Sequence, residues 1–114
     1  MASLDNNVRY LQIAFNYDLQ MVRQMLPRIP QSDRILIEAG TPFIKLTGMD
    51  GVRAIRRRWS GHIVADLKVS DGAAQEVSMA HNAGATAATV LGNAPRETID
   101  LFIEQCKQFN MLSM

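Results

Sequence analysis

The sequence predicts an α/β fold in which a parallel β-sheet is built from four β-α units. Short apolar segments begin near residues 10, 34, 62 and 86, roughly 24 to 28 residues apart. Each is followed by a segment whose apolar residues recur at helical spacing. Strands that alternate with helices are typical of a parallel sheet covered by helices. The nearly continuous apolar character of the strands favours burial on both faces.

The first unit is predicted as a strand over Tyr10–Phe15 followed by a helix that starts at Leu19. Asp18 is a candidate N-cap, because its carboxylate can accept hydrogen bonds from the free N–H groups of the first turn. Apolar residues continue at helical spacing to Ile29. Pro27 lacks an N–H group, so it is expected to end or distort this helix.

In the second unit, the predicted strand Arg34–Glu38 leads into a loop over Ala39–Pro42. Thr47 and Asp50 resemble a capping arrangement, in which side chains three residues apart accept from free N–H groups at a helix start. They predict a helix that runs to about Arg58.

The third unit is predicted as a strand over His62–Leu67 and a helix over residues 72–82, with Gly84 as its stop. The fourth unit is predicted as a strand over Thr86–Leu91 followed by a last helix. Pro95 lies in the first turn of that helix, where the backbone N–H that proline lacks would have no partner within the helix. The last helix is expected to turn one apolar stripe toward the core, made of Ile99, Leu101, Phe102, Ile103 and Cys106.

Composition and charge indicate a soluble globular domain. Of the 114 residues, 47% are hydrophobic and 20% are charged, and the formal net charge of +1 argues against a nucleic-acid partner. The arginines at 56–58 are interpreted as the solvated end of a helix. The single cysteine excludes an intramolecular disulfide. Neither a membrane span nor a secretory leader is recognisable, so we expect a cytoplasmic protein without a membrane partner.

The sequence contains only half of the β-α units that a closed barrel needs. A closed TIM (β/α)8 barrel has eight units and about 250 residues, so residues 1–114 are expected to form a single half-barrel domain. Residues 1–9 are its loose lead-in, 10–110 its β-α units, and 111–114 the start of a fifth strand. Four parallel strands alone would expose two unpaired edges and an apolar inner face. We therefore expect completion by homodimerisation, with a flattened open sheet as the alternative.

Charged residues cluster where the predicted strands end, the edge at which parallel α/β sheets carry their functional groups. Asp66 and Lys68 are two residues apart, so on a strand both point to the same face. Glu38 ends the neighbouring strand, and two carboxylates there repel unless a cation or Lys68 lies between them. An all-oxygen pair favours Mg²⁺. The alternative is a buried Glu-Lys-Asp network that only holds the sheet together.

Several blocks between Tyr10 and Asn110 resemble the first half of a hexulose-6-phosphate synthase. That family belongs to the orotidine monophosphate decarboxylase superfamily, with ketogulonate-phosphate decarboxylase. The D-x-K-x-x-D spacing is the superfamily signature, and Glu38, where the orotidine branch typically has lysine, favours the synthase branch. The matching blocks are Leu11–Asn16, Ile37–Ile44, Gly48–Met49, Val64–Asp71 and Thr89–Gly92.

The resemblance implies a lyase that carries out a Mg²⁺-dependent addition of formaldehyde to ribulose 5-phosphate. By position, Glu38 and Asp66 match the residues that bind Mg²⁺, and Lys68 matches the lysine beside the enediolate intermediate. Asp71 matches an aspartate that reaches into the active site of a partner subunit. The catalytic candidates are therefore Lys68, Asp66 and Asp71, and the candidate contacts to a sugar phosphate are Asn16, Thr41 and Gly92.

Two features depart from the family pattern. The family's first strand usually ends in Asp, whereas Asn16 can hydrogen-bond but carries no charge. The phosphate-binding loops of the family follow strands five to eight, which these residues do not contain. The alternatives are therefore a half-barrel that keeps only part of the site, an active lyase made of two copies, a non-catalytic dimerisation module, or a decarboxylase of the same superfamily.

Overall fold

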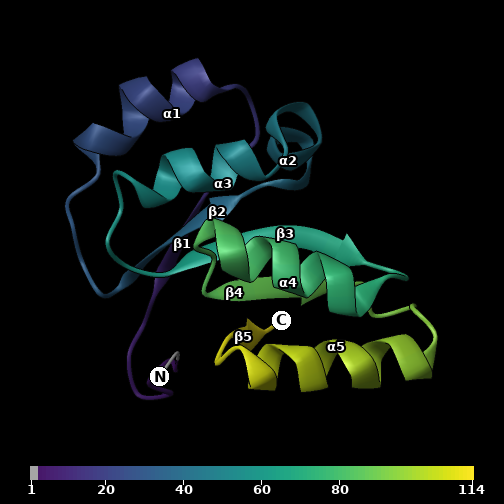
Figure 1. The fold of residues 1–114 in the computed structure, drawn as a ribbon. Helices are drawn as coiled ribbons and strands as arrows, with labels where there is room; N and C mark the ends of the chain where they lie inside the picture. The colour runs from purple at the N-terminus through teal and green to yellow at the C-terminus, as the bar shows by residue number, and fades with distance from the viewer. Residues whose placement is uncertain (1–2) are drawn as a thin grey trace.

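A computed structural model describes residues 3–114 as a five-stranded parallel sheet in the order β1-β2-β3-β4-β5, with helices between the strands (Figure 1). The α/β class and the alternation of strands and helices are thereby confirmed. The elements are β1 (Leu11–Phe15), α1 (Leu19–Met25), the 3-10 turn η1 (Leu26–Arg28), β2 (Ile35–Ala39), α2 (Thr41–Thr47), α3 (Met49–Arg56), β3 (Ile63–Val69), α4 (Ala73–Ala83), β4 (Ala87–Val90), α5 (Arg96–Gln108) and β5 (Leu112–Ser113).

The two faces of the sheet are covered differently. Strand residues such as Ile37, Ile63 and Ala65 are fully buried in a core shared with all five α-helices. Leu36 and Val64 are their neighbours in sequence and point to the opposite face, where they form a second cluster that contains no helical residue. The helices therefore lie along one face of a curved sheet, as a half-barrel requires, and the other face is open (Figure 1).

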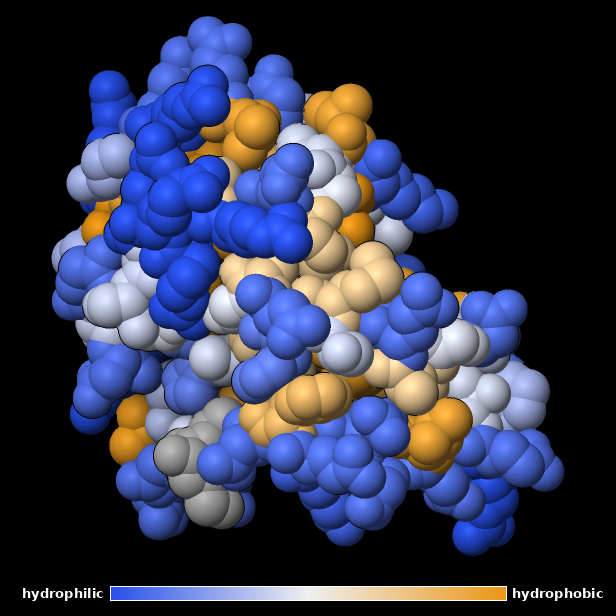
Figure 2. Space-filling view, in the orientation of Figure 1, coloured by the Kyte–Doolittle hydropathy of each residue, from blue (hydrophilic) through white to orange (hydrophobic). Residues whose placement is uncertain are grey.

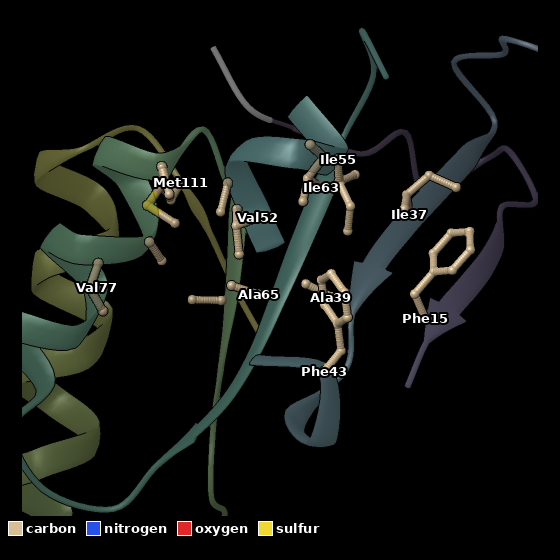
Figure 3. Packing of buried hydrophobic residues seen from close by; sticks show 14 of the residues in the cluster. Phe15, Ile37, Ala39, Phe43, Val52, Ile55, Ile63, Ala65, Val77 and Met111 are labelled. Atoms are coloured by element: carbon tan, nitrogen blue, oxygen red, sulfur yellow. The ribbon is translucent and has the colours of Figure 1, made fainter. Parts of the chain in front are cut away.

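The main core lies between the sheet and the helices. Phe15, Ile37 and Ala39 meet Phe43 of α2 near the carboxyl ends of β1 and β2, while Val52 and Ile55 of α3 pack beside β3 (Figure 3). Cys106 of α5 is buried in this core as a small apolar residue. On the outer side of the helices, hydrophilic residues dominate and apolar ones form separate patches (Figure 2).

The lead-in makes defined contacts in the described residues 3–9; residues 1–2 lie outside the described range. The chain turns at Asp5, whose backbone N–H donates to the Tyr10 hydroxyl at 2.9 Å, and Asn7 N–H donates to the Asp5 carboxylate at 2.8 Å. Leu4 and Tyr10 pack against the open-face cluster of Leu36, Val64 and Ala87. The lead-in therefore covers part of the inner face.

The predicted start of the first helix is confirmed. Asp18 is the N-cap of α1, and its carboxylate accepts from Met21 N–H at 3.0 Å. Pro27 lies in the 3-10 turn that ends the helix, as expected for a residue without an N–H group.

The predicted capping pair in the second unit is wrong. A separate helix, α2, begins at Thr41 inside the predicted loop, with Gly40 as N-cap and Pro42 in its first turn. Thr47 closes that helix, because its hydroxyl donates to the Phe43 carbonyl at 2.7 Å. The N-cap of α3 is Gly48, with φ of 62°, which breaks the segment into two helices.

Two further expectations about helices are corrected. Leu101 does not belong to the buried stripe of α5, since 44% of it is exposed. Arg56 is not part of a solvated end: its guanidinium donates to the carbonyls of Gly84 (3.0 Å) and Trp59 (2.7 Å). Burial lowers the pKa of Arg56. The arginine thus ties α3 to the end of α4.

The predicted start of a fifth strand is confirmed, because Leu112 and Ser113 pair in parallel with Ala87 and Ala88 of β4. Of the helices in residues 3–114, none is long and apolar enough to span a membrane.

Candidate active site

The centre of the candidate site is the ion pair between Asp66 and Lys68 on β3. The strand is longer than predicted and carries both residues. Between the pairs Ala65–Ala88 and Val69–Val90, β3 advances four residues where β4 advances two. This is a β-bulge, and within it Lys68 adopts a left-handed backbone conformation with φ of 46°. The Asp66 and Lys68 side chains meet within this irregular stretch.

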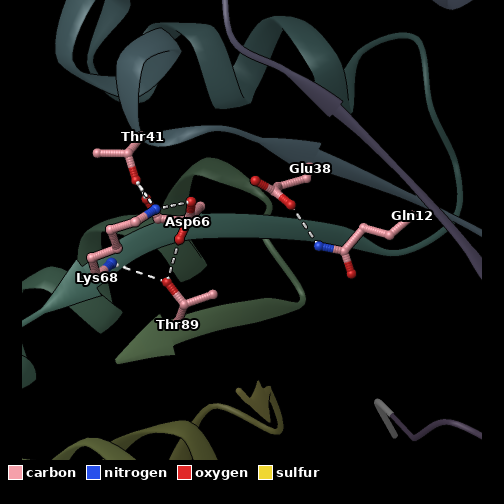
Figure 4. A network of polar contacts seen from close by, with 6 residues as sticks. All are labelled: Gln12, Glu38, Thr41, Asp66, Lys68 and Thr89. Carbon is pink, nitrogen blue, oxygen red and sulfur yellow. Dashed lines mark hydrogen bonds and ion pairs between the residues drawn. The ribbon is translucent and has the colours of Figure 1, made fainter. Parts of the chain in front are cut away.

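Two threonines from the flanking segments hold this pair (Figure 4). Thr89 of β4 donates its hydroxyl proton to the Asp66 carboxylate at 2.7 Å and accepts from the Lys68 backbone N–H at 2.9 Å. Thr41, at the start of α2, accepts from the Lys68 ammonium at 2.8 Å and donates to the Asp66 carbonyl at 2.6 Å. Both residues of the pair are thus held through main-chain and side-chain atoms.

The pair is electrostatically matched and open to solvent on one side. The Asp66 side chain is 16% exposed and that of Lys68 is 50% exposed. Burial alone would raise the pKa of the Asp66 carboxyl, but hydrogen bonds from Lys68 and Thr89, together with the Lys68 charge, lower it below its ordinary value. Asp66 is therefore an ionised, oriented carboxylate beside a half-exposed ammonium group.

Glu38 lies on the same open face but outside this network. It pairs with Val64 in the register of β2 and β3, and Asp66 follows two residues later, so both carboxylates point to one face. Its carboxylate accepts from the Gln12 side-chain amide of β1 at 2.6 Å (Figure 4). Among residues 3–114, Lys68 forms its ion pair with Asp66 and not with Glu38, so the expected three-membered network is wrong in this respect.

The donor set fits a Mg²⁺ ion in its chemistry. Mg²⁺ is commonly held by one or two carboxylates, with water and substrate oxygens completing the shell. Glu38 and Asp66 supply two carboxylates on neighbouring strands of one face. The described residues contain no group of three or more histidine, cysteine, aspartate or glutamate side chains arranged to hold a metal.

The three predicted substrate contacts lie at the same edge of the sheet but have different surroundings. Thr41 is engaged with Asp66 and Lys68. Asn16 follows β1 and lies over Gly40, where an added Cβ would come within 1.8 Å of the Asn16 side-chain oxygen. Gly92 is exposed in the turn after β4, and an added Cβ there would meet no atom within 4 Å. The structure brings Thr41 into the central network and leaves Asn16 and Gly92 at its margin.

Asp71 is exposed in the turn before α4, beyond the bulge. The pKa of Glu76 on α4 is raised, first by burial and then by the negative charge of Asp71. Its predicted role, reaching a second subunit, remains a prediction.

Sequence analysis missed the roles of Thr89 and Gln12. Thr89 begins one of the blocks that match the family, but its contacts depend on the bulge in β3. Gln12 carried a detectable signal, because it is a polar residue in an apolar strand and alternates with Ala14 toward the face that bears Glu38.

Comparison with known proteins places this geometry in a family. Residues 9–114 match the family described as "Orotidine 5'-phosphate decarboxylase / HUMPS family". The match covers nearly all of the chain, and the chain belongs to this family. The resemblance to the synthase branch and the half-barrel fold class are confirmed by the relatives below.

Two curated relatives carry the name "Bifunctional enzyme Fae/Hps". The protein from Methanothrix thermoacetophila is 45% identical over 107 residues, which are 92% of this chain and 27% of that protein. The protein from Methanocaldococcus jannaschii is 40% identical over 105 residues, 91% of this chain and 28% of that protein. The chain thus spans little more than a quarter of the length of these relatives.

Solved structures of similar fold are about twice as long as the match. The 3-hexulose-6-phosphate synthase from Salmonella typhimurium superposes with a TM-score of 0.85 at 29% identity, over 91% of this chain and 50% of that one. The 3-keto-L-gulonate-6-phosphate decarboxylase from Vibrio cholerae gives a TM-score of 0.83 at 27% identity, over 92% and 50%. These residues therefore have the architecture of one half of such barrels.

Proposed function

We propose that this chain provides half of a hexulose-6-phosphate synthase-type active site, for the Mg²⁺-dependent addition of formaldehyde to ribulose 5-phosphate. The observation that carries the proposal is the oriented Asp66–Lys68 pair at the carboxyl ends of the strands, on the open face. The relatives named for this activity support the choice of reaction.

In this proposal Lys68 stabilises charge. Its ammonium is half exposed and tethered by Asp66 and Thr41. A cation fixed at that place can stabilise the negative charge that develops on the ketose oxygens when a proton is removed beside the carbonyl. Asp66 keeps the lysine charged and oriented. Glu38 and Asp66 would hold Mg²⁺, which when bound polarises sugar oxygens as a Lewis acid.

A second copy of the chain is proposed to complete the inner face. Asp71, exposed beyond the bulge, would then contribute to the partner's site. The register adds a constraint, since Leu112 and Ser113 already hold the edge of β4. The β1 strand of a second copy must therefore pair with β5 or displace it. A cytoplasmic location and the absence of a nucleic-acid partner remain predictions from the sequence.

A decarboxylase of the same family is the second candidate. It is favoured by the nearly equal TM-scores of the synthase and the 3-keto-L-gulonate-6-phosphate decarboxylase, 0.85 and 0.83. The two candidates share the Asp66–Lys68 pair and differ in substrate. A non-catalytic dimerisation module is the third, in which the polar network is retained only as structure.

The proposal is tested by incubating the chain at high concentration with ribulose 5-phosphate, formaldehyde and Mg²⁺, and measuring formaldehyde consumption. We expect turnover in the unmodified chain and a loss of roughly 10²- to 10³-fold in Lys68→Ala, the usual effect of removing one stabilising group. Lys45→Ala is the matched control, because Lys45 is exposed on α2 and is expected to leave turnover unchanged.

The other outcomes discriminate between the candidates. Release of CO₂ from 3-keto-L-gulonate 6-phosphate without formaldehyde consumption would favour the decarboxylase. Absence of both activities, with ribulose 5-phosphate binding that is unaffected in Glu38→Gln and Asp66→Asn, would favour the non-catalytic module.

A further inference from the structure

The bulge in β3 leaves Lys68 in an unfavourable backbone conformation. Contacts with neighbouring residues must therefore stabilise that conformation. Lysine has a Cβ and a long side chain, and the left-handed region at φ of 46° is rarely occupied by such residues. The register shift between Ala65 and Val69 also takes the Lys68 N–H out of the regular ladder. An N–H outside the ladder needs another acceptor, either water or a side chain. Lys68 is exposed, so a side-chain acceptor there competes with water and can fix the conformation.

That acceptor is the hydroxyl of Thr89, which serves both residues of the pair. The Lys68 backbone N–H can only donate, so the hydroxyl proton of Thr89 is free for the Asp66 carboxylate. The distances agree: 2.9 Å from Lys68 N and 2.7 Å to Asp66 Oδ1. One hydroxyl group thus connects the main chain of one charged residue to the side chain of the other.

Thr41 acts differently. It contacts the Lys68 ammonium and the Asp66 carbonyl, which are the mobile end of the lysine and a group already fixed by the strand. Loss of Thr41 would free the lysine tip but leave the bulge intact. Loss of the Thr89 hydroxyl would remove the acceptor inside the bulge itself.

We propose that Thr89 is a positioning residue of this site, whose hydroxyl holds the left-handed conformation of Lys68 and the orientation of the Asp66 carboxylate. Through them it aims the Lys68 ammonium across the open face of the sheet. The importance of this aim for catalysis rests on the proposed function, but the positioning itself can be measured without substrate.

The experiment compares three variants of the chain by NMR. Thr89→Val removes the hydroxyl at nearly constant shape, and Thr89→Ser restores it. Thr86→Val is the matched control, because the Thr86 hydroxyl also lies between β3 and β4, where it accepts from Ile63 N–H at 3.0 Å and contacts the His62 ring at 2.9 Å. The readouts are the carbon chemical shift of the Asp66 carboxylate at neutral pH, which reports its hydrogen bonds, and the backbone chemical shifts of Lys68 that report positive φ.

We expect Thr89→Val to shift the Asp66 carboxylate resonance, because a hydrogen bond to it is lost, and to abolish the positive-φ signature of Lys68. Thr89→Ser should retain both features, and Thr86→Val should change neither. A folded Thr89→Val variant with an unchanged Asp66 resonance and unchanged Lys68 shifts would overturn the proposal, as would equal changes in Thr86→Val.

A measurement on the unmodified chain covers the case in which Thr89→Val does not fold. The Lys68 amide hydrogen is expected to exchange with solvent more slowly than that of the exposed Ser70, because Thr89 accepts from it. Equal exchange rates would contradict the role given to Thr89. Since none of these readouts needs turnover, an inactive chain would count against the proposed function and leave this inference standing.

Discussion

At the scale of single residues, the site depends on how Asp66 is kept ionised. Its carboxylate is partly buried, yet hydrogen bonds from Lys68 and Thr89 and the positive charge of Lys68 outweigh the loss of hydration. The same balance makes the residue a contributor to stability whose effect depends on pH.

We predict that Asp66 stabilises the fold at neutral pH and that this contribution is lost in acid. Its pKa is lower in the folded chain than in the unfolded one, so the contribution is complete above the unfolded value of about 4 and disappears as pH falls through the folded value. Urea denaturation between about pH 7 and pH 3 measures it. Asp66→Asn should be less stable at pH 7 and show a shallower loss toward acid than the unmodified chain.

Ionisation of Glu76 is predicted to affect the stability of the fold in the opposite direction to that of Asp66. Burial and the charge of Asp71 raise its pKa, so its ionisation opposes folding as pH rises through that value. Glu76→Gln should therefore be more stable than the unmodified chain at neutral pH.

The prediction for Asp66 has its own contrary outcome. If the free energy of unfolding of Asp66→Asn changes with pH in parallel with that of the unmodified chain, Asp66 is not the residue responsible for the loss in acid.

Gly40 is predicted to be required by its neighbours and not by its backbone conformation. An added Cβ would lie 2.9 Å from the Phe15 carbonyl and 1.8 Å from the Asn16 side chain. Gly40→Ala should therefore lower the free energy of unfolding by about 1–3 kcal/mol, as overpacking usually does. Gly92→Ala is the control, since its Cβ would meet no atom within 4 Å. Equal free energies of unfolding for the two variants in chemical denaturation would contradict this prediction. They would show that the Asn16 side chain and the Phe15 carbonyl can move away from the added methyl group at no cost.

At the scale of elements, the helices show where periodicity is a sufficient guide and where it is not. Asp18 and Gly84 lie where the sequence places them, because helix caps are local properties. The split between α2 and α3 was missed because Gly48 was not recognised as a break and Thr47 was assigned to the wrong helix.

The corrected stripe of α5 leads to a prediction. Phe102 is fully buried and Leu101 is 44% exposed, although both were expected to face the core. Phe102→Ala should lower the free energy of unfolding by about 3–5 kcal/mol through the cavity it leaves. Leu101→Ala should change it by about 1 kcal/mol or less. Thermal or urea denaturation of the two variants checks this, and a large loss for Leu101→Ala would mean that α5 is turned about its axis.

At the scale of the whole molecule, the open face is the side of the sheet that no helix covers. Leu36, Val64 and Ala87 are buried there beneath Leu4, Tyr10 and Leu112. The unpaired edge at β1 includes Leu11, which is 58% exposed. An unpaired edge that carries an exposed apolar side chain favours association.

Light scattering over a range of concentrations tests the proposed second copy. We expect a molar mass twice that of the chain, independent of concentration, because the inner faces and the β1 edges would be buried together. A stable monomer would contradict completion by homodimerisation and leave an open five-stranded sheet. A chain shortened to end at Met111 should pair more tightly if β1 of the second copy takes the place of β5.

The sequence by itself determined the parallel α/β class, the four β-α units and the edge at which Glu38, Asp66 and Lys68 gather. Strand and helix periodicities are local, and all strands of a parallel sheet end at the same edge, so these features need no knowledge of distant contacts. The family resemblance followed from the same local blocks.

Only the tertiary structure decided how those residues are connected. Thr41 and Thr89 reach Asp66 from 25 and 23 residues away in the chain, and Gln12 reaches Glu38 from 26. These contacts depend on the register between strands and on the bulge that turns Lys68 into a left-handed conformation. Register and bulges arise from packing between distant segments, which no local pattern in the sequence contains.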